Sequence, residues 1–130
     1  MYAKQVDTER RRVITTWGTV VTDASLMAYQ KSVWSDPALN GFDELIDFRA
    51  LAQVDVTTAG LQAVAHVAAG MDATAGPGRF AIVVNEGLEF GLSRMYEAFR
   101  ELEGSAVRQV MIFQQLEEAH AWLDERPEPS

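Results

Sequence analysis

The segment that most constrains the fold is Phe80-Ala81-Ile82-Val83-Val84, which is apolar at every position. A strand that is apolar on both faces must be covered on both faces, and such strands are typical of a parallel sheet flanked by helices. A strand with one face in water instead alternates apolar and polar residues. The run therefore predicts an α/β domain whose sheet is mostly parallel.

The rest of the chain alternates between strand-like and helix-like segments. Val13, Thr15 and Trp17 recur at every second position, whereas Leu92 and Tyr96 recur at helical spacing. We expect strands at residues 3–7, 11–17, 43–48, 79–85 and 107–113, and helices from 22 or 23 to 34 and at 57–70, 89–103 and 116–125. The order ββαβαβαβα predicts one domain over residues 1–125, with a mixed, mostly parallel five-stranded sheet and about four helices. Residues 126–130 are expected to form a frayed tail.

Composition excludes several classes of function. The chain of 130 residues has a formal net charge of −8, whereas binding nucleic acid without sequence preference needs a surplus of Lys and Arg. It contains no cysteine, which excludes disulfides, thiolate metal sites and a cysteine nucleophile. We find no signal peptide, and no stretch approaches the roughly 20 apolar residues of a membrane span. We therefore expect a cytoplasmic protein with no membrane span and no nucleic-acid partner.

Two acids and a pair of threonines form the first candidate site. Asp47 ends an expected strand, and Asp55 follows eight residues later, just before Thr57 and Thr58 at the start of a helix. Backbone N–H groups at a helix N-terminus favour added negative charge. Thr57 could therefore accept a phosphoryl group, or Thr57 or Asp55 could simply cap the helix. Asp47 could orient a ligand or a loop with Arg49, or accept hydrogen bonds from loop N–H groups.

This arrangement resembles the STAS domain, the fold of bacterial anti-sigma-factor antagonists. In those proteins an acid at the end of a central strand is followed by an Asp-Ser-Ser-Gly-Leu turn, and a partner kinase phosphorylates the second serine. Asp47 and Asp55 keep this spacing, and Thr57 stands where the accepting serine would be. Val56 replaces the first serine, and the turn here is one or two residues longer.

The C-terminal half is similar to a narrower branch, the SpoIIAA-like (STAS/Sec14-type) bacterial proteins, and this resemblance covers nearly the whole chain. It implies a STAS-like fold more than an activity. The segments that carry it are Ala81-Ile82-Val83-Val84, Phe90-Gly91-Leu92-Ser93-Arg94-Met95-Tyr96, Val110-Met111-Ile112-Phe113 and Glu118-Ala119-His120-Ala121-Trp122-Leu123.

Four further residues are candidates for an interface or a pocket. Phe90 projects beside Arg94 on the outer side of its expected helix, so it could belong to a dimer interface or an apolar cleft, or fold back onto the core. Trp34 and Met27 lie on the rim of the first expected helix. Residues at such borders usually complete a core, but these two could also roof a small apolar pocket like the one Sec14-type relatives use for lipid.

No group of residues in the sequence predicts catalysis. His66 and His120 lie on different expected helices without metal-ligand spacing, and the sequence has no GxSxG, GxGxxG or Walker motif. We therefore expect a protein that is not an enzyme and needs no cofactor or metal. The favoured function is an interaction or regulatory module with an unidentified kinase or regulator as partner, and a homodimer as a candidate assembly. The alternative is a carrier or sensor of an apolar or anionic small molecule, including a lipid.

Overall fold

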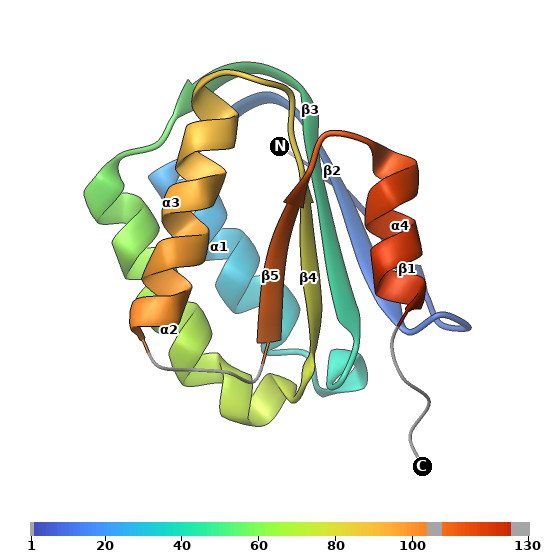
Figure 1. Ribbon diagram of the computed structural model, residues 1–130. Helices are drawn as coiled ribbons and strands as arrows, with labels where there is room; N and C mark the ends of the chain where they lie inside the picture. The colour runs from blue at the N-terminus through green and yellow to red at the C-terminus, as the bar shows by residue number, and fades with distance from the viewer. Residues whose placement is uncertain (1, 104–107, 126–130) are drawn as a thin grey trace.

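The fold is a five-stranded sheet with three helices on one face and one helix on the other (Figure 1). This computed structural model describes residues 2–103 and 108–125; the expected tail at 126–130 and the expected strand start at 107 lie outside these ranges. The predicted order ββαβαβαβα is confirmed, with one additional short 3-10 helix. The elements are β1 (Tyr2–Asp7), β2 (Arg12–Thr22), α1 (Asp23–Trp34), η1 (Pro37–Leu39), β3 (Asp43–Asp55), α2 (Thr58–Ala75), β4 (Gly78–Val83), α3 (Leu88–Leu102), β5 (Arg108–Phe113) and α4 (Leu116–Asp124).

The sheet is mixed and mostly parallel, as predicted. Its strand order is β1-β2-β3-β4-β5, in which β1 pairs antiparallel with β2 and all other neighbours are parallel. Because each new strand is added on the same side, right-handed connections place α1, α2 and α3 on one face, while α4 covers the other (Figure 1). Phe80 and Ile82 pack in the core on the three-helix face, and Ala81 and Val83 pack in the cluster under α4. This double cover explains the continuous apolar run.

Strands β2 and β3 are longer than predicted. The expected end of β3 at 48 is wrong, because the strand continues to Asp55 and pairs with β2 as far as Thr22. The pairing of β3 with β4 stops at Asp47, and that of β1 with β2 stops at Trp17. Residues 18–22 and 50–55 therefore form a two-stranded ribbon, which arches away from the sheet toward the start of α2 (Figure 1).

Two β-bulges bend this ribbon. Relative to β2, strand β3 contains one extra residue at each of two register shifts, from Thr16↔Asp47 to Gly18↔Ala50 and from Thr19↔Leu51 to Val20↔Gln53. An extra residue moves the following side chains to the opposite face of a strand. As a result Ile46, Phe48, Leu51 and Val54 all face the same interior space, although their spacing is two, three and three residues.

Helix α4 is fixed to the sheet by Arg12. This side chain lies on β2, and the residue is only 1% exposed. Its Nη2 donates to Asp124 Oδ1 at 2.6 Å, and its Nη1 lies 2.8 Å from His120 Nδ1. Because a guanidinium can only donate, His120 Nδ1 must be unprotonated in this contact. Burial, followed by the charge of Arg12, lowers the pKa of His120.

The Arg12–His120 contact makes stability depend on pH. The pKa of His120 is lower in the folded protein than its ordinary value of 6.5, so the unfolded chain binds the proton more readily. The stabilisation is therefore complete above about pH 6.5 and is lost as the pH falls below it. In His120→Gln the amide oxygen accepts from Arg12 without titrating, so we expect a flatter pH dependence of the free energy of unfolding. Urea denaturation between about pH 5 and 7.5 measures this; equal slopes for the two proteins would contradict it.

Candidate functional site

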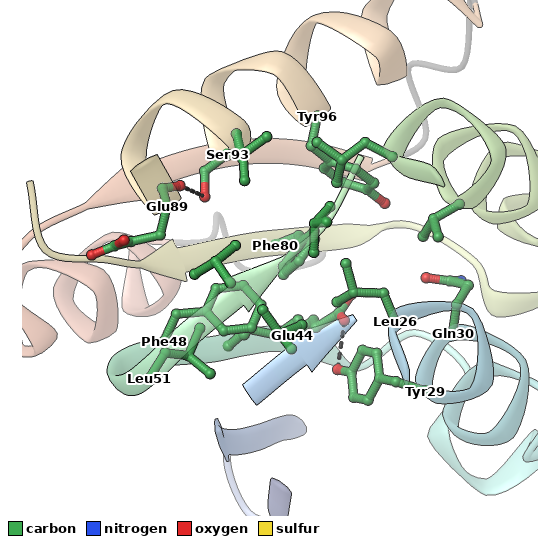
Figure 2. Close-up of a pocket in the computed structure, with 17 residues that line it drawn as sticks. Leu26, Tyr29, Gln30, Glu44, Phe48, Leu51, Phe80, Glu89, Ser93 and Tyr96 are labelled. Carbon is green, nitrogen blue, oxygen red and sulfur yellow. Dashed lines mark hydrogen bonds between the residues drawn. The ribbon is translucent and has the colours of Figure 1, made fainter. Parts of the chain in front are cut away.

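The candidate site is an apolar cavity between the sheet and helices α1, α2 and α3 (Figure 2). Its volume is about 70 Å³, and it is partly open to the surface. Since one buried water needs roughly 10–15 Å³ of such space, the cavity has room for a small chemical group several atoms in size. The ribbon supplies Val21, Leu51 and Val54 to its lining, and the three helices supply Leu26, Leu61 and Leu92.

The bulges and the sheet together create this cavity. Because the bulges keep Phe48, Leu51 and Val54 on one face, the ribbon presents apolar side chains to the helices along its whole length. Ile46 and Phe80 of the sheet line the cavity below it. The ribbon begins where β3 leaves β4, at the carboxyl end of the β3–β4 pairing. Open α/β sheets bind ligands at this end of their parallel strands.

Six of the lining residues carry polar groups, namely Tyr29, Gln30, Glu44, Glu89, Ser93 and Tyr96. Glu44 is only 3% exposed, and its Oε2 accepts a hydrogen bond of 2.6 Å from the Tyr29 hydroxyl (Figure 2). Burial raises the pKa of Glu44, while the charge of Arg108 opposes the rise. Burial and the neighbouring Glu44 also raise the pKa of Tyr29 well above its ordinary value, so this phenol keeps its proton and donates it.

A second set of buried polar side chains lies next to Glu44 and Tyr29. Arg100 Nη2 donates to Asp72 Oδ2 at 2.6 Å, and its Nη1 donates to the Tyr96 hydroxyl at 3.3 Å. Burial raises the pKa of Tyr96 to about 12. Arg108 donates to the Phe42 carbonyl at 2.8 Å. Neither arginine lines the cavity. In residues 2–103 and 108–125, no three His, Asp or Glu side chains form a group that could hold a metal ion.

Thr57 is the N-cap of α2. Its hydroxyl accepts from the Gly60 N–H at 2.9 Å and donates to Asp23 Oδ2 at 2.6 Å. Its backbone N–H donates to Asp23 Oδ1 at 2.9 Å. Thr58 is exposed at the first position of the helix, and Asp55 is exposed and accepts from Gln53 Nε2 at 2.8 Å. The Thr57 hydroxyl therefore already makes two hydrogen bonds. One of them is to an aspartate 34 residues away in the sequence, which the local sequence pattern did not indicate.

Asp47 does not end its strand but lies within it, at the point where β4 pairing stops. Its Oδ1 accepts from Arg49 Nε at 3.0 Å and its Oδ2 accepts from Arg49 Nη2 at 2.9 Å. Burial opposes ionisation of Asp47, but the hydrogen bonds from Arg49 outweigh burial and lower the pKa of Asp47. Asp47 and Thr57 therefore belong to two separate hydrogen-bonded groups, one with Arg49 and the other with Asp23.

Comparison with known proteins identifies the fold. No protein-family model matches the sequence, and no curated protein matches it significantly. A solved structure of an uncharacterized DUF3478-family protein with a SpoIIAA-like fold, from Shewanella loihica PV-4, matches 95% of this chain and 92% of its own chain with a TM-score of 0.58. The chain has a SpoIIAA-like fold. This confirms the fold expected from the resemblance, and at 15% identity the likeness shows the fold alone.

The other residues singled out from the sequence lie elsewhere in this SpoIIAA-like fold. Trp34 is only 3% exposed and is covered by Arg108, whose guanidinium lies 4.2 Å from the ring centroid. Met27 is partly buried against the main core. Phe90 is 36% exposed, and Arg94 is exposed and pairs with Glu97. None of these residues lines the cavity, which is roofed by the ribbon instead. An interface that includes Phe90 and Arg94 stays a prediction.

In the part of the chain that the structure describes, no helix has both the length and the apolar character needed to cross a membrane.

Proposed function

We propose that this SpoIIAA-like protein is a non-enzymatic binding module that takes a small, mainly apolar molecule into the cavity beneath the ribbon. The observation that carries the proposal is this partly open space between sheet and helices, whose lining is mainly apolar. Protein interiors are close-packed, with few voids larger than a water molecule. A concave apolar space with a few converging polar groups is the usual form of a ligand site. The proposal develops the carrier or sensor alternative raised by the sequence.

Binding would be driven by removal of apolar surface from water. Each methylene group that enters such a site contributes about 0.8 kcal/mol, which corresponds to a change in affinity of about fourfold. A series of n-alkanols from butanol to decanol should therefore bind progressively more tightly until the cavity is filled. Isothermal titration calorimetry would measure the series, and the failure of every alkanol to bind would contradict the proposal.

A variant that fills the cavity should block binding. Leu92 lines the cavity, whereas Leu88 lies one turn earlier on α3, is 61% exposed and is not part of the lining. We expect Leu92→Trp to weaken octanol binding by at least about tenfold because the larger ring occupies the space, and Leu88→Trp to leave the affinity nearly unchanged. Thermal unfolding of both variants checks that they are folded. Equal affinities for octanol would place binding outside the cavity.

An interaction or regulatory role around Asp47, Asp55, Thr57 and Thr58 stays a second proposal. Both threonines are exposed at the positive end of the α2 dipole, but two hydrogen bonds already hold the Thr57 hydroxyl, which favours Thr58 as the phosphoryl acceptor. A phosphate on Thr57 would instead lie against the Asp23 carboxylate. Incubation with cell lysate and ATP followed by phosphosite mapping tests this role. The absence of phosphate from both Thr57 and Thr58 would contradict it.

A further inference from the structure

The polar groups that line the cavity are acidic or neutral throughout. They are the Glu44 and Glu89 carboxyl groups, the Tyr29 and Tyr96 phenols, the Ser93 hydroxyl and the Gln30 amide. Among the described residues, no lysine, arginine or histidine lines this space. Sites that hold a carboxylate or a phosphate ordinarily place a guanidinium or an ammonium group against it.

We infer that the cavity selects a molecule with an apolar body and a hydrogen-bond-donating head that is neutral or cationic, such as an alcohol or an amine, and disfavours a carboxylate or phosphate head. This inference rests on the proposed function and narrows it. It removes the anionic small molecule from the alternatives raised by the sequence and keeps the apolar one.

The hydrogen bonds already made inside the cavity leave mostly acceptors. The Tyr29 hydroxyl donates its hydrogen to Glu44, and the Ser93 hydroxyl donates its hydrogen to the Glu89 carbonyl at 2.8 Å. Each hydroxyl has one hydrogen only, so both oxygens can act only as acceptors for a ligand. The two carboxyl groups, when ionised, add acceptors alone. Tyr96 and Gln30 are the remaining sources of donors in the lining, and both are uncharged.

Glu44 lines the inner wall of the cavity, where it would face the anionic head of a ligand. Glu44 is only 3% exposed, and when it is ionised the low polarity around it strengthens its repulsion of a second negative charge. Arg100 and Arg108 approach Glu44 closely enough to oppose the rise in its pKa. Arg100 donates to Asp72 and Arg108 donates to the Phe42 carbonyl, and neither side chain lines the cavity. A ligand head inside the cavity would therefore not be held by direct contact with either guanidinium group.

A second acid, Glu89, also lines the cavity. Glu89 belongs to the first turn of α3, and in Figure 2 it lies on the same side of the view as Leu51 and Phe48, away from Gln30. The exposed Glu86 precedes it in the loop before the helix. The net charge of −8 adds a general repulsion of anions from the surface. The two carboxyl groups of the lining, Glu44 and Glu89, are therefore unfavourable neighbours for an anionic head group.

Three probes with the same eight-carbon body test the inference: 1-octanol, octylammonium and octanoate. Titration of the wild-type protein at neutral pH and low salt should give octanol and octylammonium affinities at least about tenfold higher than that of octanoate. Octanoate binding as tightly as octanol would overturn the head-group inference and leave the proposed function standing. If none of the three binds, the proposed function itself fails.

A matched pair of variants tests which residue discriminates between the head groups. Glu89→Gln should weaken octylammonium binding by about threefold to tenfold and change octanol binding much less, because the amide keeps the size of the side chain and an acceptor oxygen but removes the charge. Glu86→Gln removes the same charge three residues earlier from a residue outside the lining, and should change neither affinity appreciably. Equal losses in the two variants would overturn the role of Glu89, because they would show only a general effect of net charge.

Discussion

Replacing Asp72 with alanine is expected to lower the free energy of unfolding by about 3–5 kcal/mol. The Asp72 and Arg100 side chains are only 5% and 6% exposed, and their charged atoms lie 2.6 Å apart. Removal of the carboxylate leaves the guanidinium buried against Tyr96 without its bonded counter-charge, which costs far more than the loss of an exposed ion pair. Urea denaturation measures the change, provided that the variant and the wild type unfold in one step.

Helix α3, which carries Arg100, supplies a control for this prediction. Arg94 pairs with Glu97 on the outer face of α3 at 3.3 Å, and its side chain is 64% exposed. Arg94→Ala should therefore cost no more than about 1 kcal/mol. The double variant Asp72→Ala/Arg100→Met should lose less than the sum of the two single variants, because it leaves no unpaired charge. A loss for Asp72→Ala as small as that for Arg94→Ala would show that the buried pair is not held as described.

The second large effect is expected for Gly60→Ala, at about 2–4 kcal/mol of destabilisation. A methyl group at Gly60 would overlap the Asp23 carboxyl group. Asp23 would have to move, and it would then lose its hydrogen bonds from the Thr57 N–H and hydroxyl, which connect the start of α1 to the start of α2. Thermal or chemical unfolding measures the loss.

Gly70 provides the matched comparison on the same helix. It lies in the interior of α2, is exposed, and a methyl group there would meet no atom within 4 Å. Gly70→Ala should therefore stabilise the protein by about 0.5–1 kcal/mol, because alanine favours the helix over the unfolded chain. The two substitutions are chemically identical, so opposite signs would isolate the contact with Asp23. Equal stabilities of the two variants would contradict this role of Gly60.

The order of elements could be predicted because it depends on local patterns. The apolar run at Phe80, the helical spacing in α3 and the cap at Thr22 all act within a few residues. The length of β3 could not be predicted in this way. Its inward residues after Phe48 are Leu51 and Val54, and the bulges that align them break the two-residue period by which a strand is recognised.

The cavity could not be predicted because it depends on how distant segments meet. Tyr29 and Glu44 come from different elements, and the acid that engages Thr57 lies on α1. An apolar stripe in a sequence predicts which side of an element is buried, but not whether the opposing stripes fill the space between them. One local signal was present: Glu44 directly precedes the apolar pair Leu45 and Ile46, and a charged residue beside a buried apolar segment indicates a specialised interior.

The ribbon divides the backbone into parts that differ in local stability. Strand β4 is paired on both sides, so its amides can exchange hydrogen only when much of the sheet opens. Residues 18–22 and 50–55 pair only with each other among the described strands, so this pair can separate while the four parallel strands stay together below it. We therefore expect the roof of the cavity to open more readily than the sheet, so that a molecule enters or leaves without global unfolding.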